Sequence, residues 1–195
     1  MATIGLDKLF YSKITEDEDG NETYATPASL AKAMTAELSV ELAEATLYAD
    51  DGAAEVVKEF QSGTLTLGVD DIGVTVAQDL TGATIDGNKV LVSTSEDGGT
   101  PVAVGFRAKK ANGKYRYVWL FKVRAKPVTE SYATKEGTTI TRQTGEVEWT
   151  AIKRTSDGRY QAIADEGEGG FDSTKAATFL ESVYTPTFTP EEDGP

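Results

Sequence analysis

The chain has 195 residues, a formal net charge of −13, and neither cysteine nor histidine. The missing cysteines exclude thiol nucleophiles, disulfides, iron–sulfur ligation and cysteine zinc sites, and the missing histidines remove the commonest general acid–base and transition-metal ligand. The negative charge disfavours stable binding to nucleic acid or to anionic membranes, because affinity for phosphates comes largely from Lys and Arg.

The amino-terminal stretch MATIGLDKLF has no basic segment followed by an apolar core. It therefore does not resemble a signal peptide. No apolar run approaches the roughly 18 residues of a membrane span. We expect a chain that folds in a cytoplasm and does not bind membranes.

The first distinctive segment is the acidic stretch TEDEDGNE, residues 15–22. It resembles a calcium-binding loop, but its register fails. If Asp17 is the first position, the sixth is Glu22, where such a loop needs glycine. The stretch is therefore predicted to be a solvated loop.

Residues 36–49 and 56–69 are predicted to be the two strands of a hairpin. In the first strand Leu38, Val40 and Leu42 alternate with polar residues, and in the second Leu65, Leu67 and Val69 do the same. Alternation with a period of two is typical of a strand with one apolar face. The apolar parity shifts near Ala43, which indicates a register break.

The rest of the chain continues this pattern. The segments PVAVGF, KYRYVWLFKVR and EVEWTAI alternate, and Asp-Gly or Asn-Gly pairs between segments predict tight turns. The second segment is predicted to place Tyr115, Tyr117, Trp119, Phe121 and Val123 on one face. Short helices are expected at Val74–Leu80, closed by Gly82, and at Thr174–Val183, capped by Asp172 or Ser173. The predicted fold class is mostly β, an antiparallel barrel or sandwich with one or two short α-helices.

The hairpin turn contains the motif Tyr48-Ala49-Asp50-Asp51. This matches the Tyr-x-Asp-Asp motif at the metal site of reverse transcriptases. A polymerase needs further carboxylates and several helices around that pair, and this chain is too short and too rich in strands. Asp51-Gly52 instead favours an exposed turn at the tip of the hairpin.

Two other chemistries fit the sequence less well. The segment RAKKANGKYRYVWLFKVRAK interleaves basic and aromatic residues, as a base-stacking sheet does, but it lacks the glycine–aromatic motif of RNA-binding sheets and fits core packing better. A glycosidase would need two carboxylates across a cleft, and no pair stands out among 32 acidic residues. We therefore expect no catalytic residue, no cofactor and no metal site, and a structural or binding role.

An ordered set of segments carries a resemblance to a known family. These segments are LYADDG, FQSGTLTLGVDDI, DGGTPVAVGFRAKKANGKYRYVWLFKVRAKPV, ESYATKEGTTITRQTGEVEWTAIKRTSDGRY and ATFLESV. Their order and spacing resemble the major tail proteins of long-tailed, non-contractile phages (siphoviruses) of Gram-positive bacteria. The resemblance runs from about Gly5 to Pro186. It implies a tail-tube β domain over residues 1–186 and a polar tail over 187–195, without the appended immunoglobulin-like domain of some relatives.

The resemblance implies a structural virion protein. Such proteins form hexameric rings that stack into a hollow tube, in which each subunit contributes to an inner β-barrel and a helix packs outside. The tube holds the tape-measure protein, joins tail-terminator and distal tail proteins, and conducts DNA as a transient, non-specific cargo. The expected location is the virion tail, after assembly in the host cytoplasm.

Two sets of residues follow as site predictions. The polar face of the hairpin is expected to line the lumen, through Glu37, Glu41, Thr64 and Thr66. The alternative that this face is outer solvent is equally open, because alternation does not say which side is wet. The acidic turns are expected to meet the next ring, through Asp17, Asp19, Asp50 and Asp51. The competing functions are a single β-sandwich surface or receptor-binding module and a carboxylate-based enzyme.

Overall fold

A computed structural model of the chain describes residues 2–49, 52–127 and 145–187. These residues form the strands β1 (Thr3–Glu16), β2 (Glu22–Tyr24), β3 (Ala28–Ser29), β4 (Ala33–Ala49), β5 (Gly52–Val69), β6 (Thr84–Ile85), β7 (Leu91–Val92), β8 (Pro101–Lys110), β9 (Tyr115–Ala125), β10 (Gly145–Ala151) and β11 (Gln161–Asp165), and the helices α1 (Val74–Thr81) and α2 (Ser173–Thr178). Within these ranges, no helix has the length and apolar character needed to cross a bilayer.

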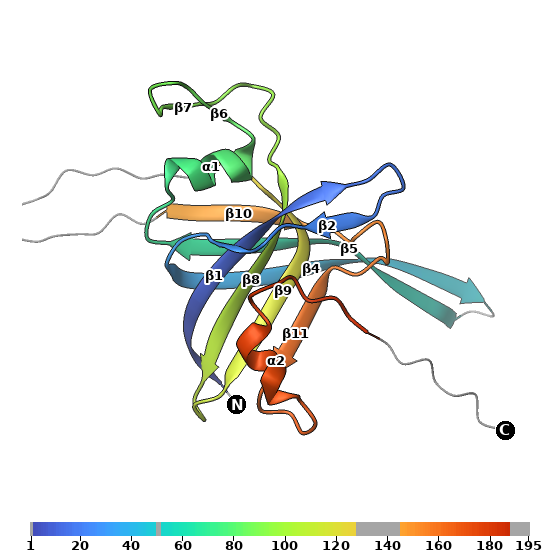
Figure 1. The fold of residues 1–195 in the computed structure, drawn as a ribbon. Helices are drawn as coiled ribbons and strands as arrows, with labels where there is room; N and C mark the ends of the chain where they lie inside the picture. Colours follow the sequence, from blue (N-terminus) through green and yellow to red (C-terminus); the bar gives the residue numbers. More distant parts are fainter. Residues whose placement is uncertain (1, 50–51, 128–144, 188–195) are drawn as a thin grey trace, which may run out of the picture.

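One antiparallel sheet forms the body of the molecule, in the order β2-β1-β8-β9-β10-β5-β4. β11 also pairs with β9, β3 pairs with β1, and β6 and β7 form a separate ribbon. β4, β5 and β10 run across β1, β8 and β9, and β1 contacts β4, so that the sheet curls towards closure (Figure 1). The prediction of a mostly β, antiparallel fold with two short helices is confirmed.

The first core lies inside the curled sheet, with α1 at its end. It contains buried side chains from five strands, among them Leu9, Leu65, Leu67, Val69, Val102, Val104, Leu120, Val123, Val147 and Trp149. Leu80 of α1 is fully buried against them. Tyr11 Oη of β1 donates to Asp79 Oδ2 at 2.8 Å, which fixes α1 to the sheet. Burial, with a smaller contribution from the Asp79 carboxylate, raises the pKa of Tyr11 to about 12.

The second core lies on the opposite face of β9, under α2 and the segment that follows it. It joins Tyr117, Trp119 and Phe121 to Phe179, Leu180 and Val183. β9 therefore buries both faces. The register between β8 and β9 shifts between Val102 and Val104. Val123, which lies opposite Val102, therefore faces the first core. The prediction that Val123 shares a face with Trp119 and Phe121 is wrong, because this irregularity reverses the parity of the strand.

The two helices differ in how well the sequence predicts them. α1 ends at Gly82, which adopts the left-handed conformation at φ 80°, as predicted. α2 begins after the Asp172 cap, but the prediction that it extends to Val183 is wrong. Trp119 Nε1 donates to the Phe179 carbonyl at 2.7 Å. That carbonyl is the acceptor that a longer helix would offer to the N–H of Val183.

The predicted hairpin is present, and it is long. β4 and β5 pair from Ala33↔Val69 to Ala49↔Gly52. The register shifts between Glu41 and Leu42, close to the break predicted near Ala43. In Figure 1 the far ends of both strands project beyond the body.

The acidic stretch 15–22 is a loop only in part. Thr15 and Glu16 end β1, and Glu22 begins β2, so the turn between them is shorter than predicted. The Glu22 side chain is fully buried and accepts from Thr155 N and Ser156 Oγ, each at 2.7 Å. Burial favours protonation of Glu22, but these hydrogen bonds and the charge of Lys122 outweigh it and lower its pKa. Sequence alone could not show these distant partners.

Candidate functional site

The outer face of β4 and β5 carries the four residues predicted to line a lumen, Glu37, Glu41, Thr64 and Thr66. Glu37 lies directly opposite Thr66, and Ser62 Oγ donates to Glu41 Oε2 at 3.2 Å. Leu65 and Leu67, which alternate with the two threonines, are fully buried on the other side of the strand. The structure therefore brings the four residues together on one face, with both glutamates exposed.

This outer face continues onto β10. Glu148 lies opposite Thr66, and Glu146 lies opposite Gly68. Lys126 forms an ion pair with Glu148. Arg124 lies on the same face, opposite Thr150. Four carboxylates accompany these two cations, so the face is acidic, and a face of this kind repels phosphate groups.

The residues predicted to form an inter-ring contact are only partly described. Asp50 and Asp51 lie outside the described residues. Asp17 and Asp19 lie in the exposed turn between β1 and β2. Asp17 Oδ1 accepts from Asp19 N at 3.0 Å and from Asn21 N at 2.8 Å, and the Asn21 side chain is the main cause of its lowered pKa. The Asp17 carboxylate thus organises its own turn.

The projecting end of the β4–β5 hairpin exposes apolar side chains. Leu42, Val56 and Val57 are 54%, 47% and 46% exposed. At the root of this end, the rings of Phe60 and Tyr160 stack with centroids 3.9 Å apart and planes 5° from parallel. The sequence predicts the hairpin but not this stack, because Tyr160 is distant in sequence.

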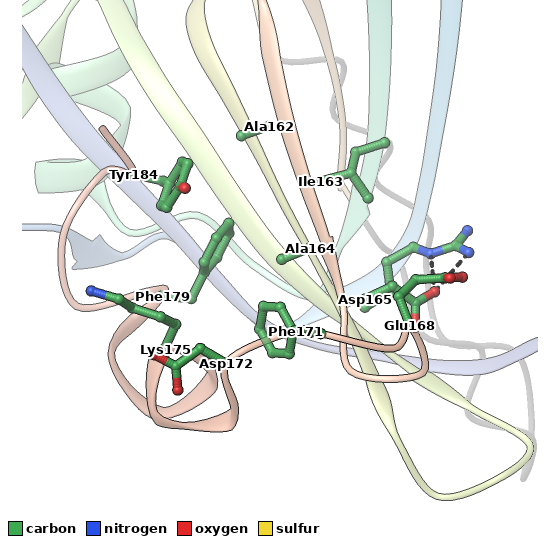
Figure 2. Close-up of a pocket in the computed structure, with 12 residues that line it drawn as sticks. Ala162, Ile163, Ala164, Asp165, Glu168, Phe171, Asp172, Lys175, Phe179 and Tyr184 are labelled. Carbon is green, nitrogen blue, oxygen red and sulfur yellow. Dashed lines mark hydrogen bonds and ion pairs between the residues drawn. The ribbon is translucent and has the colours of Figure 1, made fainter. Parts of the chain in front are cut away.

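A groove of about 640 Å³ lies between β11 and α2 (Figure 2). Ala162 and Ala164 pack against the second core, while Ile163 on the same strand is 58% exposed. Phe171 and Phe179 lie on the α2 side of the groove. The sequence does not predict this groove, because two segments without a shared motif form it.

A buried ionic cluster closes one end of this groove. Lys110 Nζ lies 2.7 Å from both carboxylate oxygens of Asp165, and Arg116 Nη2 lies 2.9 Å from Oδ2. The backbone N–H of Gly167 donates to Oδ1 at 2.8 Å. These donors, Lys110 first, hold the pKa of Asp165 far below its usual range. A carboxylate held at low pKa by donors from three residues is suited to fixing β8, β9 and β11 together and is a poor general base.

Metal-binding side chains do not gather in the described ranges. Among those residues, no group of three or more Asp, Glu, Cys or His side chains is placed to hold an ion. The expectation that the protein works without a metal stays a prediction.

Comparisons with known proteins give limited information. No protein-family model matches the sequence, and a search of curated proteins finds no match. A chain of the anti-feeding prophage cap, a tube-terminating cap, is 10% identical with a TM-score of 0.40, and the match covers 85% of this chain and 93% of that one.

Two further structures are similar at the same level. A chain of the sheath–tube complex of an extracellular contractile injection system (PVC) is 10% identical, with a TM-score of 0.36 and coverage of 83% and 91%. A chain of the anti-feeding prophage baseplate is 10% identical, with a TM-score of 0.37 and coverage of 86% and 98%. These neighbours are components of phage-tail-like assemblies, but similarity of this degree assigns no function to the chain.

Proposed function

We propose that this chain is a structural subunit of the tail-tube type, which associates with copies of itself into hexameric rings stacked as a hollow tube. Its partners are further copies, a tape-measure protein inside the tube, and tail-terminator and distal tail proteins at its ends. The tube belongs to the virion of a non-contractile phage and carries DNA as a transient cargo. The proposal rests on the sequence resemblance over residues 5–186 and is independent of the structural neighbours.

One structural observation supports the association between copies. The apolar face of the β4–β5 hairpin continues beyond the part of the hairpin that packs on the first core. Leu38 and Leu65 pair over the first core, and Leu42 continues the same face at 54% exposure. Exposed apolar side chains on a projecting strand pair are typical of a surface that binds another protein. A subunit that assembles with copies of itself would cover them.

The acidic outer face is proposed to line the tube. Glu37, Glu41, Glu146 and Glu148 would keep DNA phosphates hydrated and prevent their adhesion to the wall. Glu37→Lys combined with Glu41→Lys should still permit tubes, since both side chains are exposed. Virions with the double substitution should release DNA more slowly, in a salt-dependent manner. Normal tails with unchanged release would show that this face lies elsewhere.

The acidic turns are proposed to contact the next ring. Asp17 is engaged within the β1–β2 turn, so the contact is assigned to Asp19, which lies beside the exposed Glu18. Asp50 and Asp51 belong to the same proposal from their sequence position alone. Substituting Asp19 with Asn should weaken stacking while leaving single rings intact.

Electron microscopy of the purified protein at high concentration, with and without virion tail nucleators, tests the proposed function. Rings or tubes are expected. Monomers under all conditions would favour the alternative, a single β-sandwich surface or receptor-binding module. Ultracentrifugation over a concentration series gives an independent measure of the same difference.

A further inference from the structure

The turn between β8 and β9 contains the pair Asn112-Gly113. Lys110 N donates to Lys114 O at 2.8 Å, and Gly113 N donates to Lys110 O at 3.0 Å. Gly113 adopts the left-handed conformation at φ 81°, and residues 111–114 are all exposed. No described atom lies within 4 Å of a Cβ atom built on Gly113. The tip of this turn can therefore move without displacing a packed side chain.

The side chain of Asn112 is held over the peptide that follows it. Lys114 N donates to Asn112 Oδ1 at 3.2 Å, which closes a small ring that includes the Gly113 nitrogen. The Asn112 Cγ atom and that nitrogen are thereby kept near each other. A backbone N–H directed at a carbonyl oxygen also stabilises the negative charge that develops there when the carbonyl carbon is attacked. Among the described residues, Asn112 Nδ2 has no hydrogen-bond partner, so this amide nitrogen is free to leave.

The turn between β6 and β7 has the same main-chain hydrogen bonds but a different arrangement of side chains. Asp86 N donates to Val90 O at 2.9 Å, Lys89 N donates to Asp86 O at 3.1 Å, and Lys89 is left-handed at φ 66°. Here, however, Val90 N donates to Asp86 Oδ1 at 2.9 Å and not to Asn88. Asn88 Nδ2 donates to Asp86 Oδ2 at 3.4 Å. Asn88 thus has neither the oxyanion donor nor the free amide nitrogen of Asn112.

The first residue of each turn causes this difference. The short carboxylate of Asp86 accepts from the N–H groups two and four residues further on. Lys110 occupies the equivalent position of the β8–β9 turn, and its ammonium group is buried against Asp165. The N–H of Lys114 consequently remains for the side chain of Asn112.

We propose that Asn112 is a site of spontaneous deamidation in the folded chain, promoted by the Lys114 N–H. The Gly113 nitrogen gives its proton to hydroxide and attacks Asn112 Cγ, and the new Cγ–N bond produces a tetrahedral oxyanion. This intermediate collapses, the Cγ–Nδ2 bond breaks, and Nδ2 takes a proton from water and leaves as ammonia. Water then hydrolyses either carbonyl of the resulting succinimide, which gives aspartate or isoaspartate. The reaction needs the folded chain and water, so it is independent of the proposed function.

One hydrogen bond opposes the reaction. Gly113 N–H is donated to Lys110 O, so this bond must open before the nitrogen can attack. Opening a single exposed hydrogen bond slows a reaction by about tenfold at most. Lys89 N–H makes the same bond in the β6–β7 turn, and its effect therefore cancels when the two turns are compared.

Lys89→Gly supplies the matched control, because it places a glycine after Asn88 at a position that is already left-handed. The variant chain is incubated in its folded state at neutral and mildly alkaline pH, and peptide mass spectrometry measures deamidation at both asparagines. Asn112 should react at least about tenfold faster than Asn88, because it alone has the oxyanion donor and the free leaving group. Its rate should rise with pH, because the attacking nitrogen is deprotonated.

Ion-exchange chromatography gives a second measure. Residues 109–114 contain three lysines and no acid, so deamidation lowers the positive charge of this segment by one. The more acidic species should accumulate in the unsubstituted chain and be absent from Asn112→Gln, whose longer side chain does not form the five-membered ring.

Incubation of the Lys89→Gly variant in urea separates the effect of the folded turn from that of the local sequence. In the unfolded chain the two Asn-Gly pairs should react at similar rates. If Asn112 stays intact in the folded chain and reacts in urea, the turn protects it and the proposal is overturned. Equal rates at Asn112 and Asn88 in the folded variant would overturn the role assigned to the Lys114 N–H.

Discussion

The packed body and the projecting end of the hairpin are built from the same strands but differ in what covers them. Over the body, Leu65 and Leu67 of β5 are fully buried, and β9 is covered on both faces. At the far end, Leu42 and Val56 are about half exposed. The alternating pattern continues along the hairpin although the core does not. Stability is therefore concentrated in the body, and the exposed apolar surface of the hairpin at its far end.

The ion pairs of the body and of the projecting hairpin end also differ in how far they are buried. In the body, Asp165 and Lys110 are both less than a tenth exposed and form a short ion pair. On the hairpin, Lys58 and Glu44 are 3.1 Å apart but more than half exposed. Exposed pairs contribute about 0–1 kcal/mol, whereas an unpaired buried charge costs several times more. Substitutions in the two regions should thus affect different measurements.

The largest effect is expected at Trp119, which is fully buried in the second core. Trp119→Ala should lower the free energy of unfolding by about 3–5 kcal/mol, because it removes the ring and leaves a cavity. Trp119→Phe keeps most of the packing but leaves the Phe179 carbonyl without its indole donor, at a cost of about 1–3 kcal/mol. Urea unfolding measures both. If the free energy of unfolding falls by less than it does for a surface substitution, the second core is not important for stability.

The next largest effect is expected at Asp165. Asp165→Asn leaves the buried ammonium of Lys110 without its counter-charge and should cost about 3 kcal/mol. Glu148→Gln removes an exposed carboxylate from Lys126 and is the matched control, with an expected loss of about 0–1 kcal/mol. Equal losses in the two variants would show that burial of the cluster has no energetic consequence.

The same variant predicts a change in pH dependence. The pKa of Asp165 is lowered in the folded state, so the unfolded state binds the proton more tightly. Its contribution to stability is present above the ordinary carboxyl pKa and is lost as the pH falls below it. Asp165→Asn should flatten the acid side of the stability curve relative to the unsubstituted chain. Thermal unfolding across pH 2–6, roughly the range of carboxyl titration, measures the difference.

A smaller effect is expected at Gly105 of β8. A Cβ atom at this position would lie 2.7 Å from three ring atoms of Trp119. Gly105→Ala should therefore cost about 1–3 kcal/mol through overpacking. At Gly87 no described atom lies within 4 Å of an added Cβ, so Gly87→Ala should be close to neutral. Chemical denaturation of the two variants tests whether the glycine is needed for close packing.

The sequence predicts the local features of this fold well. Alternation identifies the strands and the buried residues Leu65, Leu67 and Trp149, and Gly82 marks the end of α1. These features depend on neighbouring residues, which a sequence displays directly. The length of the hairpin and its register break follow from the same pattern.

The failures have a common physical cause. Val123 changes face because of an irregularity between two strands, and α2 ends where a tryptophan from β9 takes the Phe179 carbonyl. Lys110 and Asp165 are 55 residues apart, and neither has a local motif that marks it. Contacts between distant segments decide all three. Alternation separates a core face from an outer face, but it cannot say whether the outer face meets solvent, a lumen or another copy.

The smallest expected effect on stability lies at the boundary between the two regions. Phe60 and Tyr160 stack where the hairpin leaves the body, beside the register shift in β4 and β5. Tyr160→Ala should cost only about 1 kcal/mol, the usual contribution of an aromatic pair. It should, however, loosen the hairpin beyond the shift, because the stack joins β5 to the segment that precedes β11. Tyr184→Ala is the matched control, since it removes the stack of Tyr184 on Phe179, in the second core. Hydrogen exchange should rise at the far ends of β4 and β5 in the first variant alone. Identical exchange in the two variants would show that the hairpin holds its direction without the Phe60–Tyr160 stack, and that the boundary between body and projecting end lies elsewhere.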